Sequence, residues 1–161
     1  MKITDKYVFF WNGIYSQWHM AQMTIDEVEY NCAEQYMMHQ KALLFGDTEI
    51  AAEVMKVTHP RDHKALGRKV KGYDEAIWKR ACLGIVYKGN LAKFTQNEDL
   101  KEELLNTGNK VLVEASPVDF IWGIELGEND PNAENPSEWK GTNLLGFTLM
   151  LVRNEIVNSN Q

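Results

Sequence analysis

The sequence predicts an α+β protein: one helix-rich domain, residues 1–161, built around a small β-sheet. Its length of 161 residues suits a single domain, and no internal repeat, low-complexity stretch or linker rich in proline and glycine divides it. Hydrophobic residues make up 44% and charged residues 25%, which is typical of a globular protein with one core. Helix caps and helical spacing dominate the middle of the chain, whereas short β-type runs lie before residue 31 and after residue 109.

Short runs of aromatic and β-branched residues predict the strands. The first run ends at Asn12 and Gly13, which favour a turn. The second and third can pair as a hairpin across Asp26 and Glu27, although glutamate suits a tight turn poorly. The predicted strands are residues 7–11, 20–25, 28–30, 110–115 and 120–126.

Capping residues and helical spacing predict the helices. Asn31, Asp47, Asp74 and Asn97 each stand where an N-cap is expected, and Gly46 suits a helix end. The run 58–60 opens a helix because proline is tolerated in a first helical turn. The predicted helices extend from Asn31 to about residue 45, from Asp47 to about residue 57, from residues 58–60 onward, from Asp74 to about residue 94, over 98–106 and over 141–157. Residues 130–139 are predicted to form a loop.

The sequence lacks the marks of a secreted or membrane-spanning protein. Its longest apolar run, residues 144–152, is far shorter than the roughly 20 residues that span a bilayer. No apolar stretch follows the N-terminal charges, which argues against a secretory signal. Cys32 and Cys82 are too few and too far apart for a disulfide framework or a zinc knuckle. We therefore expect a cytoplasmic protein with reduced thiols and no contact with membranes.

The charge is uneven along the chain. Residues 56–93 hold ten Lys and Arg against three Asp and Glu, a local balance of +7 in a chain of net charge −6. The overall acidity argues against general adhesion to nucleic acid, while the basic segment suits an anionic ligand such as a phosphate ester. Lysines on solvated helix faces would give the same count, so both interpretations stay open.

The sharpest local feature is a carboxylate and an amine on one predicted helix. Glu34 and Lys41 are seven residues apart, so they share a helix face and are separated by about 10 Å of rise. Met37 and Met38 lie between them, which gives a polar ligand an apolar surface. A structural alternative is that Glu34 and Asn31 form a capping box, which has this spacing.

Aromatic and polar residues form a second set of candidates. Exposed aromatic rings beside Ser, Gln, Asp and Asn suit stacking on a planar heterocycle and hydrogen bonding to a sugar, although tryptophan more often fills a core. These candidates are Ser16, Gln17, Trp18, Asp119, Trp122, Gly123, Trp139 and Asn143.

Other kinds of site find no support. His59 and His63 have i,i+4 spacing, but no glutamate follows the first and Pro60 intervenes, so no metal is predicted. No phosphate loop or dinucleotide fingerprint is present, and neither the cysteines nor Ser16 and Ser116 have a nucleophile signature. We expect no cofactor.

Eight runs of the chain are characteristic in composition and order: residues 34–42, 45–47, 66–68, 78–80, 92–97, 104–108, 112–123 and 139–146. Together they resemble the NADAR family, in particular its YbiA-like branch. The resemblance extends from about residue 9 to residue 153 in the family's order, and the run that ends in DFIWG at 119–123 is highly specific. Among the departures, Glu27 and Glu125 stand where the family commonly has glycine.

The resemblance implies an N-glycosidase with helices around a small sheet. Two activities are known in the family. One cleaves the bond between ribose phosphate and the base in early riboflavin intermediates, and the other removes ADP-ribose from guanine in nucleic acid. Both break a ribose C1–N bond. The expected partner is thus a phosphate-bearing small molecule or ADP-ribosylated substrate, with nucleic acid involved only as a modified substrate. The alternative is a non-catalytic module that binds ADP-ribose or NAD.

For the enzyme, each candidate has an expected role. Glu34 is the first choice for the carboxylate that stabilises an oxocarbenium-like transition state, and Asp119 is the second. Lys41 either holds the ribose or phosphate, or forms a Schiff base with the opened sugar. Substrate-binding candidates are Arg68, Lys79 and Arg80 for phosphate, Trp78, Trp122 and Trp139 for the base, Gln35 and Asn143 for hydroxyls, and the neighbouring Ser16, Gln17, Trp18 and Gly123.

Overall fold

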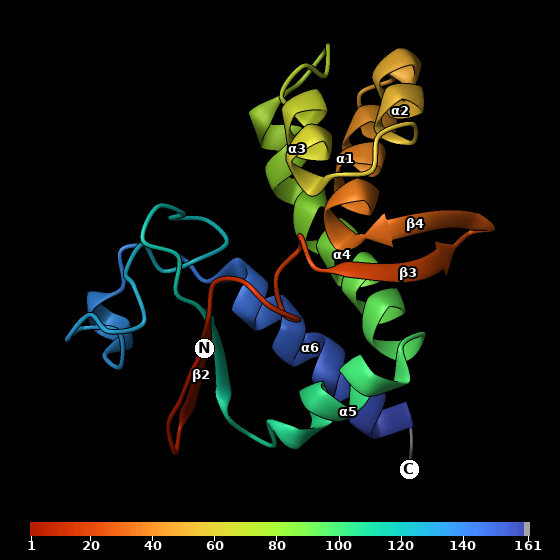
Figure 1. The fold of residues 1–161 in the computed structure, drawn as a ribbon. Coiled ribbons are helices and arrows are strands. Elements are labelled where there is room, and N and C mark those ends of the chain that lie inside the picture. Colours follow the sequence, from red (N-terminus) through yellow and green to blue (C-terminus); the bar gives the residue numbers. More distant parts are fainter. Residues whose placement is uncertain (160–161) are drawn as a thin grey trace. The chain divides into compact units, whose positions relative to one another are not determined.

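The computed structural model describes residues 1–159 and confirms the α+β class. These residues form two compact units (Figure 1). The helical unit is Gln17–Asn97, and the terminal unit combines Met1–Ser16 with the described chain from Glu98 on. Each unit is described by itself below, and the prediction of one domain over the whole chain stays a prediction.

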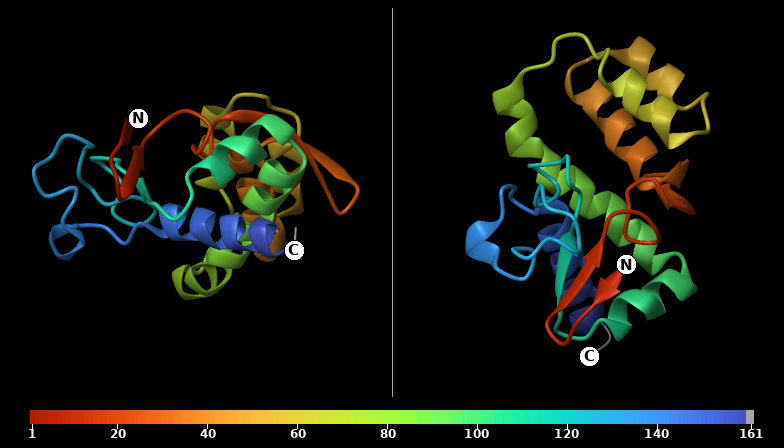
Figure 2. Two further views of the ribbon diagram at one scale, coloured as in Figure 1. Left: turned by 90° about the horizontal axis from the view of Figure 1, so that it is seen from below. Right: turned by 60° about the vertical axis from the view of Figure 1, so that its left-hand side comes forward.

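The terminal unit contains a three-stranded sheet in the order β1-β2-β5. β2 pairs antiparallel with β1 and parallel with β5, and α6 packs on β5 (Figure 2). Gly146 makes this close packing possible, because any side chain there would run into the Leu112 carbonyl. The elements are β1 Lys2–Ile3, β2 Tyr7–Phe10, α5 Glu98–Asn106, β5 Val111–Glu114, the short 3₁₀ helix η1 Pro136–Glu138 and α6 Leu144–Ser159.

The helical unit consists of a β-hairpin followed by four helices. α1 packs against α2, α3 and α4, and β3 packs against α4 (Figure 1). The small residues Gly67 and Gly89 let these helices approach, since side chains there would meet Met38 and Tyr36. The elements are β3 Met20–Ile25, β4 Val28–Cys32, α1 Ala33–Leu44, α2 Thr48–Val54, α3 Pro60–Gly67 and α4 Glu75–Thr95.

The predicted hairpin and three of the predicted helix starts are confirmed. Asp26 and Glu27 have φ of 51° and 69°, the left-handed pair that a tight primed turn requires. The side chains of Asp47 and Asp74 accept hydrogen bonds from the third residue of α2 and of α4. α3 begins at Pro60 as expected, whereas α2 ends at Val54, three residues earlier than predicted.

The predicted capping box of Asn31 and Glu34 is wrong. The pairing of β4 with β3 keeps the chain extended as far as Cys32, which stands opposite Met20. Cys32 is therefore the N-cap of α1 and makes no side-chain cap bond, and Glu34 is the second helical residue. Gln35 takes the third position instead, and its Oε1 accepts a hydrogen bond from the backbone N–H of Asn31 at 2.8 Å. Capping therefore does not explain a glutamate at position 34.

The strand predicted at 120–126 is also wrong. The backbone N–H groups of Ile121 and Trp122 donate to Asp119 Oδ1, and Glu125 has a left-handed φ of 57°. These local bonds hold the segment in turns, although Ile124 still donates to the Glu114 carbonyl at 3.0 Å. The sequence analysis also missed β1. Over residues 1–159, every helix is too short or too polar to cross a membrane.

Candidate functional site

The first turn of α1 carries Glu34 into the interior of the helical unit. Its side chain is only 6% exposed, unusual for a carboxylate. The backbone N–H of Glu34 donates to the Gln17 carbonyl at 3.0 Å, which ties the start of α1 to the segment before β3. Since capping does not require this glutamate, a buried acid here is a candidate for chemistry.

Lys41 lies two turns further along α1, in a half-buried aromatic setting. Its Nζ is 4.8 Å from the centre of the Tyr73 ring and 5.7 Å from that of Trp78, within cation–π range. Burial lowers the pKa of the Lys41 amine, the negative charge of Glu34 partly opposes this, and Arg68 lowers the pKa further. The amine is thus easier to deprotonate than that of an ordinary surface lysine.

The helical unit brings four of the predicted site residues together. Glu34 and Arg68 both act electrostatically on Lys41, and Trp78 forms part of its wall. A carboxylate, an amine of lowered pKa, a guanidinium and aromatic rings together suit a polar substrate with a flat base and a phosphate. Tyr73, from the loop before α4, belongs to the same group. It was not predicted from the sequence, and its contact with Lys41 in the structure identifies it.

Gln17 joins this group through its backbone and side chain. Its Oε1 accepts a hydrogen bond from Asn90 Nδ2 at 2.8 Å, and Asn90 also donates to the Val86 carbonyl. Asn90 is fully buried on α4, and within the described structure its Oδ1 has no hydrogen-bond partner. Sequence reasoning missed Asn90 because a lone asparagine in a helix gives no signal.

Three other predicted contacts of the helical unit lie differently. The amide of Gln35 is occupied by backbone groups, the N–H of Asn31 and the carbonyl of Val54, which argues against a role in binding hydroxyls. Lys79 is exposed and pairs with Glu75 at 3.2 Å. Arg80 is exposed on α4. Of the basic segment, Lys93 is fully buried, so its ten cations are not simply a solvated surface.

In the terminal unit, the polar candidates bond mainly to their own backbone. Asp119 Oδ1 accepts from Ile121 and Trp122 at 2.9 and 2.8 Å. Asn143 is fully buried and has a φ of 53°, and its amide bonds Glu114 N–H and the Leu112 carbonyl. These bonds fix the loop and its junction with α6 and β5.

The remaining candidates of the terminal unit also have structural contacts. Trp139 packs against the core around Phe9 and donates from Nε1 to the Ala133 carbonyl at 2.8 Å. Gly123 is buried, and a side chain there would crowd the carbonyls of Glu114 and Asp119. Trp122 is half-buried in the same loop, and the backbone N–H of Ser16 donates to the Gly13 carbonyl.

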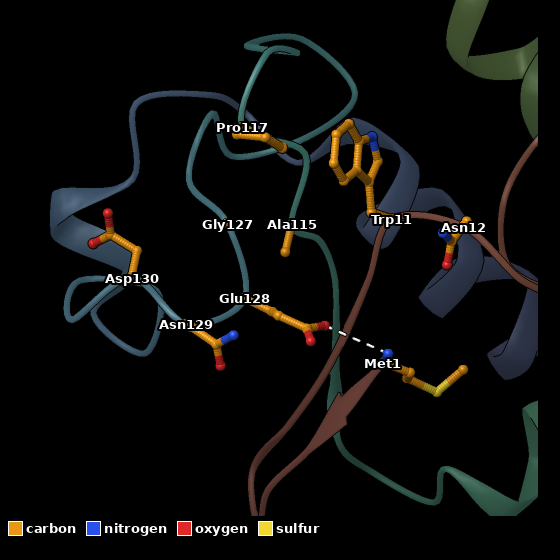
Figure 3. A pocket seen from close by; sticks show the side chains of 9 residues that line it. All are labelled: Met1, Trp11, Asn12, Ala115, Pro117, Gly127, Glu128, Asn129 and Asp130. Carbon is orange, nitrogen blue, oxygen red and sulfur yellow. Dashed lines mark ion pairs between the residues drawn. The ribbon is translucent and has the colours of Figure 1, made fainter.

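The terminal unit also has a hollow of about 540 Å³, which contains none of the predicted site residues. Trp11 lies on one side of it, while Glu128 forms an ion pair of 3.5 Å with the amine of Met1 (Figure 3). The complete lining is Met1, Trp11, Asn12, Ala115, Pro117, Gly127, Glu128, Asn129 and Asp130. Its carboxylates do not favour a phosphate-bearing ligand.

The cysteines and histidines show no arrangement for metal or thiol chemistry. Among residues 1–159, no three His, Cys, Asp or Glu side chains are placed to hold an ion. Cys32 and His63 are buried and 3.6 Å apart, and the other ring nitrogen of His63 is 2.9 Å from the Val57 carbonyl. Burial raises the pKa of the Cys32 thiol to about 11, which makes it a poor nucleophile.

The α1 site combines a buried carboxylate with a half-buried amine and aromatic rings, a combination found at many functional sites. Comparison with known proteins identifies the family: the NADAR domain model matches residues 8–157. The N-glycosidase R617 of Acanthamoeba polyphaga mimivirus is 43% identical over 94% of this chain and 97% of its own length. The chain belongs to the NADAR family.

Two further relatives bear on fold and activity. The solution NMR structure of the Escherichia coli protein YbiA matches with a TM-score of 0.80 at 25% identity, over 99% of this chain and 89% of that one. The maize chloroplastic riboflavin biosynthesis protein PYRR is 31% identical over 69% of this chain but only 17% of its own length. The predicted family and fold are confirmed, and the predicted enzyme class, a hydrolase of N-glycosyl bonds, is confirmed at that level.

Proposed function

We propose that this protein hydrolyses the bond between ribose C1 and a base nitrogen, and that the helical unit supplies the reacting groups. The observation that carries the proposal is the buried carboxylate of Glu34 on the same helix as the Lys41 amine, whose ammonium form lies over Tyr73 and Trp78. Buried groups with perturbed protonation cluster at functional sites. The carboxylate meets the main need of the reaction, since the sugar becomes cationic as the bond breaks.

The chemistry requires few groups. The C1–N bond breaks with its electron pair leaving on the base, which takes up a proton from solvent, and the ribose becomes an oxocarbenium ion. The negative charge of Glu34 stabilises that ion and orients a water molecule. The water oxygen bonds to C1 and its proton passes to the carboxylate, which returns it to solvent. The base and the sugar, as ribose phosphate or ADP-ribose, are then released. Trp78 stacks against the base, and Arg68 pairs with phosphate.

Two roles fit Lys41. As an ammonium ion it holds the ribose or its phosphate. As a neutral amine it attacks the aldehyde of the opened sugar and forms an imine with loss of water, which a later water molecule reverses. The pKa of Lys41, lowered by burial, favours the second role. Treatment with borohydride during turnover would trap the imine as a stable adduct on Lys41, whereas the holding role leaves no adduct.

Two substrates have the required bond. A ribosylaminopyrimidine phosphate of the riboflavin pathway is supported by the likeness to the maize riboflavin biosynthesis protein. ADP-ribosylated guanine of nucleic acid is supported by the family resemblance and by the basic segment, which suits a phosphate-bearing group. Both are consistent with the cytoplasmic location and reduced thiols that we propose.

The test is incubation of the protein with each substrate separately, with chromatographic detection of released base and released sugar. The proposal expects both products in equal amounts from at least one substrate, with a Glu34→Gln variant as the inactive control. Tight binding of ADP-ribose without release of base from either substrate would favour the non-catalytic module. EDTA should not abolish activity, because the proposed step uses no metal.

A further inference from the structure

Trp18 precedes β3 and presents an aromatic surface to solvent. It is 40% exposed, although large aromatic side chains are usually largely buried. It directly follows Gln17, whose carbonyl accepts the hydrogen bond from Glu34 N–H. The backbone that carries the indole is therefore tied to the start of α1.

Two side chains accompany the indole, those of Lys64 on α3 and of His59, the N-cap of that helix. The Nζ of Lys64 is 6.0 Å from the centre of the Trp18 ring, and the His59 ring stands edge-on to it at 6.2 Å between centres. His59 Nδ1 accepts a hydrogen bond from Arg61 N–H at 3.0 Å. A proton on the neutral imidazole must therefore be on Nε2, where it can be donated to a ligand.

The same helix connects this group with Lys41. α3 has eight residues, Pro60–Gly67, and is therefore about 12 Å long. His59 caps its first turn, and Arg68, which lowers the pKa of Lys41, follows its last residue. His59 and Arg68 are nine residues apart, about 13 Å of helical rise, whereas Lys64 lies only one turn, about 6 Å, before Arg68.

We propose that Trp18, His59 and Lys64 form a subsite for a second base and its phosphate, beyond the base and ribose of the bond that is cleaved. This inference rests on the proposed N-glycosidase function and selects the extended substrate, ADP-ribosylated guanine. The indole stacks on the base, a contact that tolerates any base, and Lys64 and His59 bind the phosphate beside it. A ribosylaminopyrimidine phosphate has one base and one phosphate, so it leaves the subsite empty.

The second base has two chemical sources. It is either the adenine of the ADP-ribose group itself or the nucleotide next to the modified guanine in a nucleic-acid strand. Kinetic measurements with ADP-ribosyl guanosine, with an ADP-ribosylated guanine in a short single-stranded oligonucleotide, and with ribosylaminopyrimidine phosphate distinguish them. KM and kcat are measured for each substrate.

Two variants and their matched controls test the subsite. Trp18→Leu should raise KM for an ADP-ribosylated substrate about tenfold more than KM for the aminopyrimidine. Lys64→Gln should act in the same direction, and Lys64→Arg should restore most of the loss. The controls are Trp11→Leu, an indole 53% exposed in the terminal unit, and Lys56→Gln, an exposed lysine just before α3.

Each outcome is decisive. A rise in KM for both ADP-ribosylated substrates assigns the subsite to adenine, and a rise for the oligonucleotide alone assigns it to the neighbouring nucleotide. Equal effects of Trp18→Leu on all three substrates, or none, would overturn the inference, as would a wild-type enzyme that cleaves only the aminopyrimidine. Failure of the wild-type enzyme to cleave any of the three would instead overturn the proposed function.

Discussion

The two units use similar polar residues in different ways. In the terminal unit, the amide of Asn143 and an oxygen of Asp119 bond to nearby backbone groups, and these bonds hold the loop and the start of α6 in place. In the helical unit, Lys41 faces aromatic rings, and its pKa responds to Glu34 and Arg68. The comparison indicates that hydrogen-bond partners can separate residues that hold a loop in place from residues that we propose to take part in the reaction.

The largest expected effect on stability is in the terminal unit. Asn143→Ala should lower the free energy of unfolding by about 2–4 kcal/mol, because two buried backbone groups lose their partners. Chemical denaturation measures this loss. Lys140→Ala, an exposed change in the same loop, is the control and should change stability by less than about 0.5 kcal/mol. A fully stable Asn143→Ala variant with lost turnover would show that Asn143 serves catalysis, which would contradict the structural role assigned to it in the terminal unit.

A buried lysine in the helical unit predicts a dependence of stability on pH. Burial lowers the pKa of Lys93 to about 7, whereas an unfolded lysine titrates near ~10.4. Between these values the unfolded chain binds more protons, so Lys93 makes stability rise with pH. Lys93→Met should flatten the rise in unfolding free energy between pH 7 and 9. An unchanged slope would mean that Lys93 keeps an ordinary pKa.

Arg68 should affect both phosphate binding and the protonation of Lys41. Arg68→Ala should raise KM about tenfold for a phosphorylated substrate and far less for its dephosphorylated form, since a charge-assisted bond is lost. Because Arg68 lowers the pKa of Lys41, its loss should move any rate increase that depends on neutral Lys41 to higher pH. Lys69→Ala, an exposed neighbour, is the control. Equal losses for both substrates would make Arg68 structural.

The smallest effects concern the two glutamates with left-handed backbone. Glu27→Gly in the hairpin and Glu125→Gly in the loop should each stabilise the protein by about 0.5–1 kcal/mol, because glycine adopts this conformation without strain. Glu29→Gly, in the regular backbone of β4, should destabilise it instead. Thermal unfolding of the three variants provides the measurement. Destabilisation by both turn variants would contradict the strain argument.

The elements that sequence predicted best have local causes. Asp47 and Asp74 start helices through bonds from backbone N–H groups three positions on, so their signals need no tertiary information. The start of α1 was predicted wrongly because the pairing of β4 with β3 determines it, and the local sequence around Asn31 does not reveal that pairing. The strand at 120–126 failed because Asp119 bonds the backbone N–H groups that a ladder would need.

The candidate site could be predicted only where helical spacing brings residues together. Glu34 and Lys41 lie on one helix, so their face could be inferred. Tyr73 and Asn90 reach the site through the packing of α4 and the loop before it on α1, which no spacing reveals. The family motif located Asp119 and Asn143, but motif strength does not separate a residue that shapes a loop from one that reacts.

The most direct test of the account is the turnover of a Glu34→Gln variant. Because Glu34 does not cap α1, and a charge at a helix start contributes only about 0.3–1 kcal/mol, the variant should fold normally. Its kcat should fall by about 10²-fold or more, with a much smaller change in KM, since the charge acts when the sugar becomes cationic. A normally folded variant with near-normal kcat would contradict the account and move the catalytic role to Asp119 or Lys41.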